Sequence, residues 1–332
     1  MEYLSISPLQ LHALLTYTPA GFYCERGDFY IDPTRVVPKA VITHGHSDHA
    51  RGGCKQYLCT PQCESILRQR LGRRISVQTV PYGEPISLNG VRVSLHPAGH
   101  ILGSAQVRLE YQGNICVVSG DYTLIPDATC APFEPIRCHT FITETTFGLP
   151  IYKWPPSQDV FRAINTWWSL NAEEHTTSVI HAYSLGKAQR VITGVDALIG
   201  PIITHETVEN MNTCYRKSGV NLPKIHVAQN VAEKDMFERA LVVTPSSANM
   251  PELAEKCAHI STAFASGWMQ IRKGRKNSSF DRGFVLSDHA DWEGLLQSIE
   301  LSCAETIWTA HGSTPAFVRF LQEKGLDARF LN

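Results

Sequence analysis

The segment Thr43-His44-Gly45-His46-Ser47-Asp48-His49 gathers three imidazoles and one carboxylate within six residues. His44 and His46 lie two positions apart, so both rings can point to one side at the end of an extended segment. Asp48 and His49 are adjacent and are better placed to bind a neighbouring ion. Zinc binds imidazole nitrogen and carboxylate oxygen at about 2.0 to 2.2 Å, and catalytic sites keep one position for water. The spacing therefore predicts a hydrolytic centre of two zinc ions, against the alternative of a solvated loop that is rich in histidine.

The composition of the chain indicates a globular protein without a strong overall charge. The 332 residues, 43% of them hydrophobic, suffice for one large domain or two ordinary ones. Lys and Arg number 30 against 31 Asp and Glu, which gives a formal net charge of -1. This balance does not favour binding to nucleic acid or to an acidic membrane, so any site for a polyanion must be local.

The chain shows no sequence signal for secretion or for the membrane. No stretch approaches the roughly 18 to 20 consecutive apolar residues of a transmembrane helix, and residues 1–10 have neither a basic start nor a long apolar run. Ten cysteines are scattered between Cys24 and Cys303, without the CxxC pairs of a structural zinc site. We therefore expect reduced thiols, no membrane association and a cytoplasmic location.

The texture of the sequence changes twice along the chain. Short β-rich runs with turn signals precede Ser157, whereas long amphipathic helices between short strands follow it and indicate βαβ units with a parallel sheet. After about Asp281 the chain returns to strand, loop and helix units. Strands are predicted at 21–24, 29–31, 40–42, 92–96, 106–111, 115–118, 283–286 and 305–309, and helices at 61–71, 159–170, 187–199, 208–218, 292–300 and 315–322.

Four more polar residues follow predicted strands. His100 lies in a loop flanked by glycines and could complete the histidine set of the first metal, and Asp121 offers two oxygens that could bridge two cations. Asp32 could hold a ligand histidine in one tautomer, although an Asp-Pro turn with Pro33 explains its position equally well. Far downstream, His311 again lies just past a strand. A single sheet edge would gather all of these side chains.

These residues, in this order, resemble the signature of the metallo-β-lactamase fold. The resemblance implies that His44, His46 and His100 bind one zinc ion and that Asp48, His49 and His311 bind the other. Asp121 and a hydroxide would bridge the two ions, and Asp32 would orient a ligand.

Three further motifs resemble the β-CASP nucleases within that fold. Thr143-Glu144-Thr145-Thr146-Phe147-Gly148 is similar to their motif A, Ser287-Asp288-His289-Ala290-Asp291 to motif B, and Ala310-His311-Gly312 to motif C. The resemblance implies an αββα sandwich formed by residues 1–148 and 282–332. It also implies an inserted cap domain with a parallel sheet and helices at residues 149–281.

Other blocks resemble the bacterial ligase-associated DNA exonucleases nearly end to end. They are residues 21–25, 27–33, 130–135 and 264–270. The likeness implies a DNA exonuclease that acts on 5′ ends of single strands, uses two divalent ions such as Zn²⁺ or Mn²⁺, and works beside an ATP-dependent DNA ligase in repair. We accordingly expect a bacterial protein whose activity is associated with the nucleoid.

The expected chemistry assigns roles to Glu144 and His289. Two metal ions about 3.5 to 4 Å apart lower the pKa of a bridging water and neutralise phosphate oxygens, so that hydroxide attacks phosphorus in line. His289 would protonate the leaving 3′ or 5′ oxygen, with Glu144 hydrogen-bonded behind it. On spacing alone, a remote structural hydrogen bond for His289 and a strand-end salt bridge for Glu144 fit equally well, and the resemblance favours the catalytic roles.

Basic residues in the inserted block are candidates for binding the nucleic acid. Lys187 and Arg190 begin a predicted helix, where the amides at the helix N-terminus add to the attraction for phosphate. The densest positive run comprises Arg272, Lys273, Arg275 and Lys276, although such runs are usually solvated faces.

Three other functions compete with a DNA exonuclease. A histidine at motif C, here His311, is common in RNA-processing β-CASP proteins and keeps RNA open as a substrate. A catalytically inactive scaffold for nucleic acid would need a defect, yet every predicted ligand is present. A small-molecule metallohydrolase gives no reason for Glu144, His289 and the inserted block.

Overall fold

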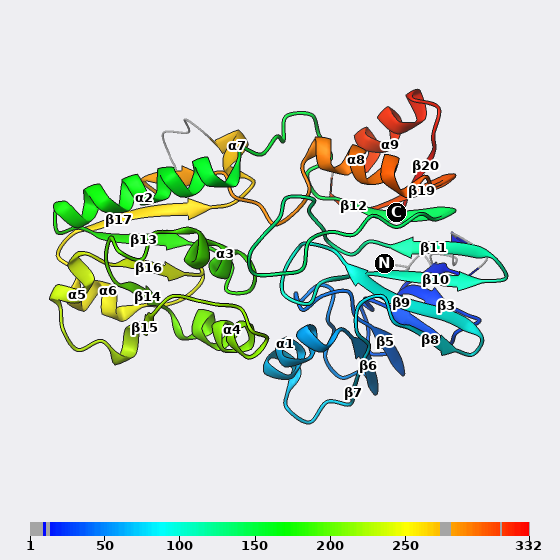
Figure 1. Ribbon diagram of the computed structural model, residues 1–332, viewed down its shortest axis with the longest axis horizontal. Coiled ribbons are helices and arrows are strands. Elements are labelled where there is room, and N and C mark those ends of the chain that lie inside the picture. The colour runs from blue at the N-terminus through cyan, green and yellow to red at the C-terminus, as the bar shows by residue number, and fades with distance from the viewer. Residues whose placement is uncertain (1–8, 11–13, 273–279, 313, 332) are drawn as a thin grey trace, which may run out of the picture. The chain divides into compact units, whose positions relative to one another are not determined.

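The computed structural model describes residues 9–10, 14–272, 280–312 and 314–331, and the chain forms two compact units. Unit 1 comprises residues 1–150 and 289–332, and unit 2 comprises residues 151–288. Figure 1 shows the two units, with unit 2 inserted between the two chain segments that build unit 1.

The first sheet of unit 1 joins an antiparallel meander to parallel strands. Its seven strands follow chain order from β1 to β7, antiparallel up to β4 and parallel from β4 onward. They are β1 (Leu9–Gln10), β2 (Thr16–Thr18), β3 (Gly21–Cys24), β4 (Phe29–Ile31), β5 (Lys39–Val41), β6 (Gln56–Cys59) and β7 (Val77–Thr79). Because β4 and β5 are parallel neighbours, the residues that follow them meet at one edge of the sheet.

The second sheet of unit 1 has the order β20-β19-β12-β11-β10-β9-β8. Strands β11, β12, β19 and β20 are parallel, and β9 runs in the same direction because both β9 and β11 are antiparallel to β10. The strands are β8 (Pro85–Leu88), β9 (Val91–Pro97), β10 (Ala105–Tyr111), β11 (Asn114–Val118), β12 (Thr140–Thr145), β19 (Thr306–Gly312) and β20 (Asp327–Phe330). The carboxyl ends of β9, β11, β12 and β19 therefore lie at the same edge.

Unit 1 is layered as helix, sheet, sheet and helices. Apolar side chains from the facing surfaces of the two sheets, such as Ile31, Val41 and Leu109, form one buried cluster between them. Helix α1 (Pro61–Leu71) packs on the outer face of the first sheet. Helices α8 (Trp292–Ser302) and α9 (Thr314–Glu323) pack on the outer face of the second. The burial of apolar area on both faces of each sheet is the main force that stabilises this arrangement.

Unit 2 is built on a six-stranded sheet in which all neighbouring strands are parallel. Its order is β15-β14-β16-β13-β17-β18. The strands are β13 (Thr177–His181), β14 (Ile202–Thr204), β15 (Ile225–Val227), β16 (Leu241–Thr244), β17 (Ile260–Ala265) and β18 (Arg282–Phe284). Parallel strands need helical crossovers, and β13 and β16 are buried on both faces except at His181, which is half-buried.

Helices connect and cover the strands of unit 2. Side chains of α2, α3 and α4 share one buried cluster on the sheet, and a second cluster includes Phe237 of α5. The helices are α2 (Ser157–Glu173), α3 (Lys187–Gly194), α4 (Glu206–Lys217), the 3₁₀ turn η1 (Ala228–Asn230), α5 (Asp235–Glu238), α6 (Pro251–Lys256) and α7 (Met269–Arg272).

Several predicted elements occur in the structure with the predicted bounds, among them β3, β4 and α1. The prediction of a helix over 187–199 is wrong at its end, because α3 stops at Gly194 and Val195 is extended with φ -88° and ψ 157°. Asp196 then accepts a hydrogen bond from the Leu198 amide at 3.0 Å, which favours a turn over another helical turn.

Unit 2 also extends beyond Asp281, where the sequence suggested that the inserted block ends. Strand β18 pairs with β17 and so belongs to the sheet of unit 2, which continues to Asp288.

Over the described ranges, which omit residues 1–8, 11–13, 273–279, 313 and 332, no helix has both the length and the apolar character needed to cross a lipid bilayer.

Candidate metal centre

The candidate site lies where several strands of unit 1 end. Asp32 follows β4, His44 follows β5, His100 follows β9, and Asp121 follows β11, while Glu144 lies near the end of β12. The parallel pairing of these strands brings residues that are far apart in sequence to one edge of the two sheets. The register of the sheets, rather than local sequence, therefore positions the site.

Four predicted metal ligands converge on one point. The Nε2 atom of His44 lies 3.0 Å from Nδ1 of His46, and that Nδ1 lies 3.1 Å from Nε2 of His100. The Oδ2 atom of Asp121 lies 3.5 Å from Nε2 of His44 and 3.7 Å from Nε2 of His100. One ligand atom from each of the four residues lies within 4.8 Å of the others. We call these four residues the inner set.

The hydrogen bonds of His44 show which of its nitrogens faces the inner set with a lone pair. The hydroxyl of Thr43 can donate to Asp32, which leaves the Thr43 oxygen to accept a hydrogen bond from Nδ1 of His44 at 3.1 Å. In that tautomer Nε2 of His44 carries no proton and points at His46 and Asp121. Burial lowers the pKa of His44 well below its usual value, and the nearby His49 lowers it further. His44 is therefore held as a neutral imidazole, the form that binds a metal.

The geometry of the inner set fits a tetrahedral cation. Bonds of about 2.0 to 2.2 Å in a tetrahedral site place ligand atoms roughly 3.3 to 3.6 Å apart. The four separations of 3.0, 3.1, 3.5 and 3.7 Å bracket that value. Three imidazole nitrogens and one carboxylate oxygen are a donor set that suits zinc. Lone pairs that converge in this way repel one another unless a cation lies between them.

The other three predicted ligands, Asp48, His49 and His311, are less tightly gathered, and we call them the outer set. The Nε2 atom of His49 lies 3.4 Å from Oδ2 of Asp121 and 3.8 Å from Oδ2 of Asp48. The side chain of Asp48 is 70% exposed, whereas that of His49 is 3% exposed. His311 is exposed, and its ring centroid lies 5.3 Å from that of His49. Asp121 is thus the carboxylate that touches both sets.

The charges around His49 favour a cation at its Nε2 atom. Burial lowers the pKa of His49, but the carboxylates of Asp121 and Asp32 outweigh burial and raise the pKa well above its usual value. For Asp121 the two effects have the opposite sign. Burial raises its pKa, but the neighbouring His49 and His289 outweigh burial and bring the pKa well below its usual value. The same carboxylates that stabilise a proton at His49 would stabilise a divalent cation bound there.

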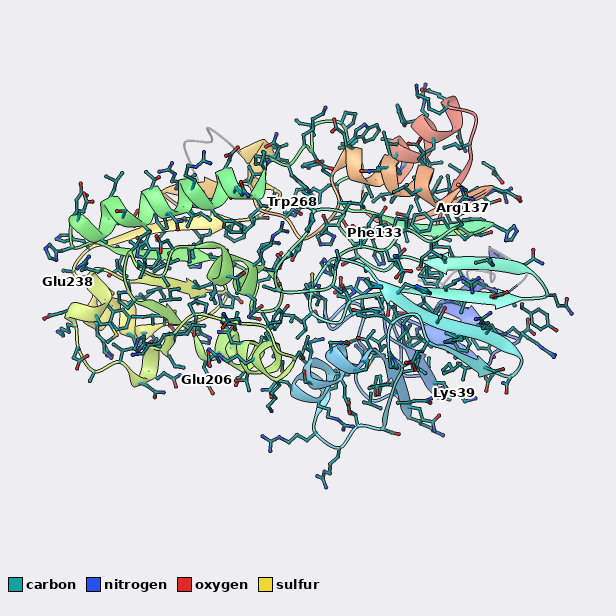
Figure 2. All side chains as sticks on the ribbon, viewed as in Figure 1. Lys39, Phe133, Arg137, Glu206, Glu238 and Trp268 are labelled. Atoms are coloured by element: carbon teal, nitrogen blue, oxygen red, sulfur yellow. The ribbon has the colours of Figure 1, made fainter. Side chains whose placement is uncertain are left out.

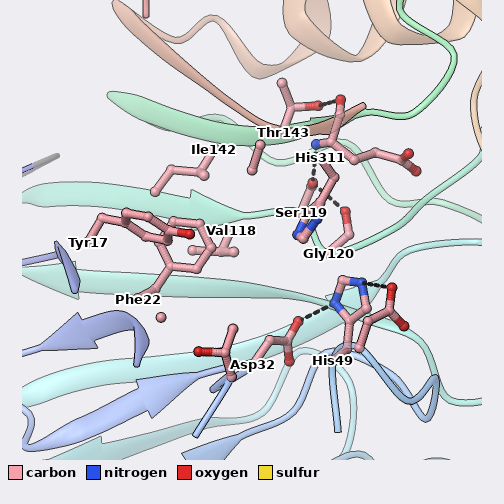
Figure 3. Close-up of a pocket in the computed structure, with 15 residues that line it drawn as sticks. Tyr17, Phe22, Asp32, His49, Val118, Ser119, Gly120, Ile142, Thr143 and His311 are labelled. Atoms are coloured by element: carbon pink, nitrogen blue, oxygen red, sulfur yellow. Dashed lines mark hydrogen bonds and ion pairs between the residues drawn. The ribbon is translucent and has the colours of Figure 1, made fainter. Parts of the chain in front are cut away.

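Asp32 organises the segment that carries the histidines. Its Oδ2 atom accepts a hydrogen bond from Nδ1 of His49 at 2.8 Å, and its Oδ1 atom accepts one from the Thr43 amide at 2.8 Å. Asp32 adopts φ 43°, an uncommon backbone conformation for a residue other than glycine. Figure 3 shows this carboxylate pointing at His49. The contact fixes Nδ1 as the protonated nitrogen, so Nε2 is the nitrogen that faces the outer set.

A small cavity lies on the side of the outer set that faces the interior of the sandwich. Its volume is about 50 Å³, and its lining includes Asp48, His49 and His311 at the polar end. Tyr17 and Phe22 of the first sheet line the apolar end, opposite Val118 and Ile142 of the second sheet (Figure 3).

Glu144 and His289 form a hydrogen-bonded pair beside the inner set. The Nδ1 atom of His289 lies 2.9 Å from each carboxylate oxygen of Glu144. Glu144 is buried, whereas 18% of the His289 side chain is exposed. The ring centroid of His289 lies 4.8 Å from that of His100. The pair therefore places an imidazole that a carboxylate orients beside the metal ligands, as a proton donor there would require.

The structure adds three residues for which the sequence indicated no role. Thr43 links Asp32 to His44, as described above, and its only sequence signal was its place at the start of the histidine segment. Arg70 of α1 donates a hydrogen bond to the carbonyl of Gly45 inside that segment. Tyr122 donates its backbone amide to Glu144 at 2.9 Å. No spacing rule connects residue 70 to the site, and the place of Tyr122 next to Asp121 does not predict its contact with Glu144.

The basic residues proposed to bind nucleic acid have other partners in unit 2. The ammonium group of Lys187 lies 3.1 Å from Oδ1 of Asp288, and both side chains are buried. Arg190 donates hydrogen bonds to the carbonyl of Ser287 and to the hydroxyl of Ser157. The two cations therefore tie α3 to the last residues of unit 2, which weakens the expectation that they bind phosphate.

Of the remaining residues predicted to bind nucleic acid, Arg272 lies within the described part of the chain. Arg272 is the last residue of α7, whereas Lys273, Arg275 and Lys276 lie outside the described residues. Trp268 precedes α7, and its side chain is 40% exposed (Figure 2).

Comparison with known sequences gives relatives with three kinds of name. No family model matches the chain. A probable DNA ligase from Opitutus terrae is 28% identical over 312 residues, which are 93% of this chain and 30% of that protein. The human DNA cross-link repair 1A protein is 28% identical over 165 residues, 47% of this chain and 16% of that protein. Endoribonuclease YSH1 of Saccharomyces cerevisiae is 27% identical over 134 residues, 36% of this chain and 15% of that protein.

The chain spans less than a third of the length of each of these three relatives. Among solved structures, a protein of unknown function from Enterococcus faecalis V583 shares the fold. The TM-score is 0.57 at 11% identity, and the match covers 89% of this chain and 79% of that protein.

The relatives include proteins named for DNA cross-link repair and for RNA cleavage, and they match a chain that carries the histidine and carboxylate motifs described above. These relatives are consistent with a place for the chain among the β-CASP nucleases of the metallo-β-lactamase fold.

Proposed function

We propose that this protein is a metal-dependent nuclease that hydrolyses phosphodiester bonds of DNA, from the 5′ ends of single strands, in DNA repair. The observation that carries the proposal is the Glu144–His289 pair beside the inner set, since a proton donor next to a metal site is what the cleavage of a phosphodiester needs. The relative named as a probable DNA ligase, which matches 93% of the chain, supports DNA as the substrate and a ligase as the functional partner.

The proposed architecture follows the family. Unit 1 is taken as the αββα metallo-β-lactamase sandwich and unit 2 as the β-CASP cap domain. The inner set and the outer set are taken as the ligands of two divalent ions, Zn²⁺ or Mn²⁺, with Asp121 shared between them. When bound, two such ions lower the pKa of water and neutralise the non-bridging oxygens of a phosphate.

The residues of the chain would contribute orientation and one proton. Hydrolysis adds a water oxygen to phosphorus and breaks the bond from phosphorus to the leaving sugar oxygen, which must take up a proton. His289 would supply that proton from Nε2, because Nδ1 is engaged by Glu144. A carboxylate at hydrogen-bond distance stabilises the imidazolium form and fixes the ring. Asp32 would hold His49 in the tautomer that presents Nε2.

A test of this function compares matched strands of DNA and RNA. The purified protein is incubated with single-stranded DNA and with RNA of the same sequence, each labelled at the 5′ or the 3′ end, with Zn²⁺ or Mn²⁺. His46→Ala and His289→Ala are tested beside it, and His259→Ala is the control, since His259 is exposed in unit 2. We expect DNA ladders from the wild type and from the control, and none from the two site variants.

Other results of the same experiment would change the conclusion. Preferential cleavage of RNA would favour a ribonuclease, which the yeast endoribonuclease relative and His311 support. Intact DNA and RNA with metal ions bound would favour a nucleic-acid-binding scaffold instead. Ladders that persist in His289→Ala at the wild-type rate would contradict the role proposed for that residue.

A further inference from the structure

Tyr122, which lies in the loop after β11, links Asp121 to the Glu144–His289 pair. We propose that Tyr122 is a positioning residue that holds the proton donor His289 in register with the metal ligand Asp121. The inference rests on the function proposed above. It adds a residue to the machinery of protonation, although Tyr122 itself touches neither substrate nor metal.

The backbone of Tyr122 contacts both members of the proton-donating region. Its amide donates to Oε1 of Glu144 at 2.9 Å, and its carbonyl accepts from the amide of Ala290 at 2.6 Å. Ala290 directly follows His289. One residue therefore fixes the carboxylate that orients His289 and the backbone that carries His289, while its peptide bond to Asp121 connects both to the inner set.

The hydroxyl of Tyr122 contacts the same two chain segments at another point. It lies 2.9 Å from the hydroxyl of Thr143 on β12 and 2.5 Å from the hydroxyl of Ser298 on α8. Ser298 donates its own proton to the carbonyl of Leu295 at 2.8 Å, so the Tyr122 hydroxyl is the donor to Ser298. The Thr143 hydroxyl can then donate to Tyr122 or to the carbonyl of Glu144, which lies 3.0 Å away.

The ring of Tyr122 has no freedom to move between these anchors. Its side chain is among the largest fully buried ones, and its ring centroid lies 5.2 Å from that of Phe133 and 6.3 Å from that of Phe141. Figure 2 labels Phe133, which belongs to the long connection before β12. Close packing of this kind holds a side chain in one rotamer.

The two ends of Tyr122 therefore brace β12 against the segment from His289 to α8. Thr143 is the neighbour of Glu144 in β12, and α8 begins three residues after His289. Loss of the hydroxyl would leave every metal ligand and the backbone contacts of Tyr122 in place, yet it would remove one of the anchors that set the separation of Glu144 and His289. The expected defect is one of protonation rather than of metal binding.

The test uses Tyr122→Phe and two oligonucleotides that differ in one atom. In the second oligonucleotide, sulfur replaces the bridging oxygen that leaves, and this oxygen is identified from the ends of the wild-type products. A thiol has a pKa near about 8.5, so it leaves as a thiolate without needing a proton donor. General acid catalysis contributes about 10²- to 10⁴-fold to a rate, and its partial loss should slow Tyr122→Phe on the oxygen substrate by roughly tenfold or more.

We expect Tyr122→Phe to cleave the sulfur substrate within about twofold of the wild-type rate, because cleavage of this substrate does not depend on the proton donor. Its bound metal, measured by plasma emission after dialysis, should equal that of the wild type. Tyr57→Phe is the control for a lost buried hydroxyl, since the Tyr57 hydroxyl donates to the Arg51 carbonyl at 2.8 Å, away from Glu144. Any effect of this control should be equal on both substrates.

A second pair of variants keeps the test decisive should Tyr122→Phe fold poorly. Thr143→Val removes the hydroxyl that contacts Tyr122, whereas Thr143→Ser retains it. We expect Thr143→Val to lose rate on the oxygen substrate alone and Thr143→Ser to recover that rate.

Equal slowing of both substrates, or unchanged rates on both, would overturn the role of Tyr122. A wild-type protein that cleaves neither substrate would instead overturn the proposed function.

Discussion

The inner and outer sets share Asp121 but differ in how the fold holds them. Three of the four inner residues are buried, and neighbouring ligand atoms lie 3.0 to 3.7 Å apart. In the outer set only His49 is buried, while Asp48 and His311 reach it from exposed positions. Burial fixes side chains in advance, so the inner set is preorganised for a cation and the outer set needs the cation to complete it.

The physical reason for this difference is the support beneath each set. His44 is held by Thr43, and the backbone amide of His100 is held by the hydroxyl of Ser104 at 3.1 Å. His49 is the one outer residue with an equivalent partner, the carboxylate of Asp32. We therefore expect two ions of unequal affinity, with the tighter one at the inner set.

The largest effect should follow from removing an inner ligand. His44→Ala should abolish binding of the tighter ion. It should also reduce nuclease activity by more than the roughly 10- to 100-fold loss that follows the change of a residue that only hydrogen-bonds to a metal ligand. Metal content by plasma emission and the rate on DNA measure the two effects. If the variant still binds the tighter ion, the claim that the inner set holds this ion is wrong.

A smaller and different effect is expected from Asp48→Ala. Because this carboxylate is exposed and lies 3.8 Å from His49, its loss should release the weaker ion and leave the tighter one bound. A calorimetric titration with Zn²⁺ should then show one binding event in place of two. Loss of both ions would show that the two sets are not independent.

Asp32→Asn should weaken the outer set without removing a ligand. The amide cannot replace both oxygens that hold His49 and Thr43, so we expect the affinity for the weaker ion to fall by about 10- to 100-fold. Asp28→Asn is the matched control, since Asp28 also has a positive φ, of 55°, but its side chain is 56% exposed and paired with Lys39. The control should bind both ions like the wild type.

The smallest expected effect concerns Thr43, which supports both sets. Thr43→Val leaves the Nδ1 proton of His44 buried without a partner, and such a loss costs about 1 to 3 kcal/mol of stability. Thr43→Ser retains the hydroxyl and should lose less. The midpoint of urea unfolding, measured without metal ions, compares the two variants, and a smaller loss in Thr43→Val than in Thr43→Ser would contradict the tautomer assigned to His44.

Strand-end arguments predicted which side chains lie close together. His100 and Asp121 were singled out because each follows an apolar strand, and parallel pairing does bring them to His44. Such reasoning works because the direction of a strand fixes which of its ends reaches the edge. It requires no knowledge of the sequence distance between strands.

Contacts set by tertiary packing could not be predicted in the same way. Tyr122 and Arg70 act through a backbone amide and a guanidinium whose partners, Glu144 and the carbonyl of Gly45, are distant in sequence. Lys187 and Arg190 show the opposite limit, and their contact with nucleic acid stays a prediction. Their positive charge at a helix start suggested phosphate, whereas Asp288 and the carbonyl of Ser287 are their partners in the fold.

The border between the two units has a consequence for how such a protein can be rebuilt. Asp288 is the last residue of unit 2 and pairs with Lys187, while His289 is the first residue of the returning segment of unit 1 and pairs with Glu144. One peptide bond thus joins an anchor of one unit to the proposed acid of the other. A chimaeric protein with a foreign unit 2 must therefore reproduce the Lys187–Asp288 pair. Otherwise the new junction will displace His289, on which turnover is proposed to depend.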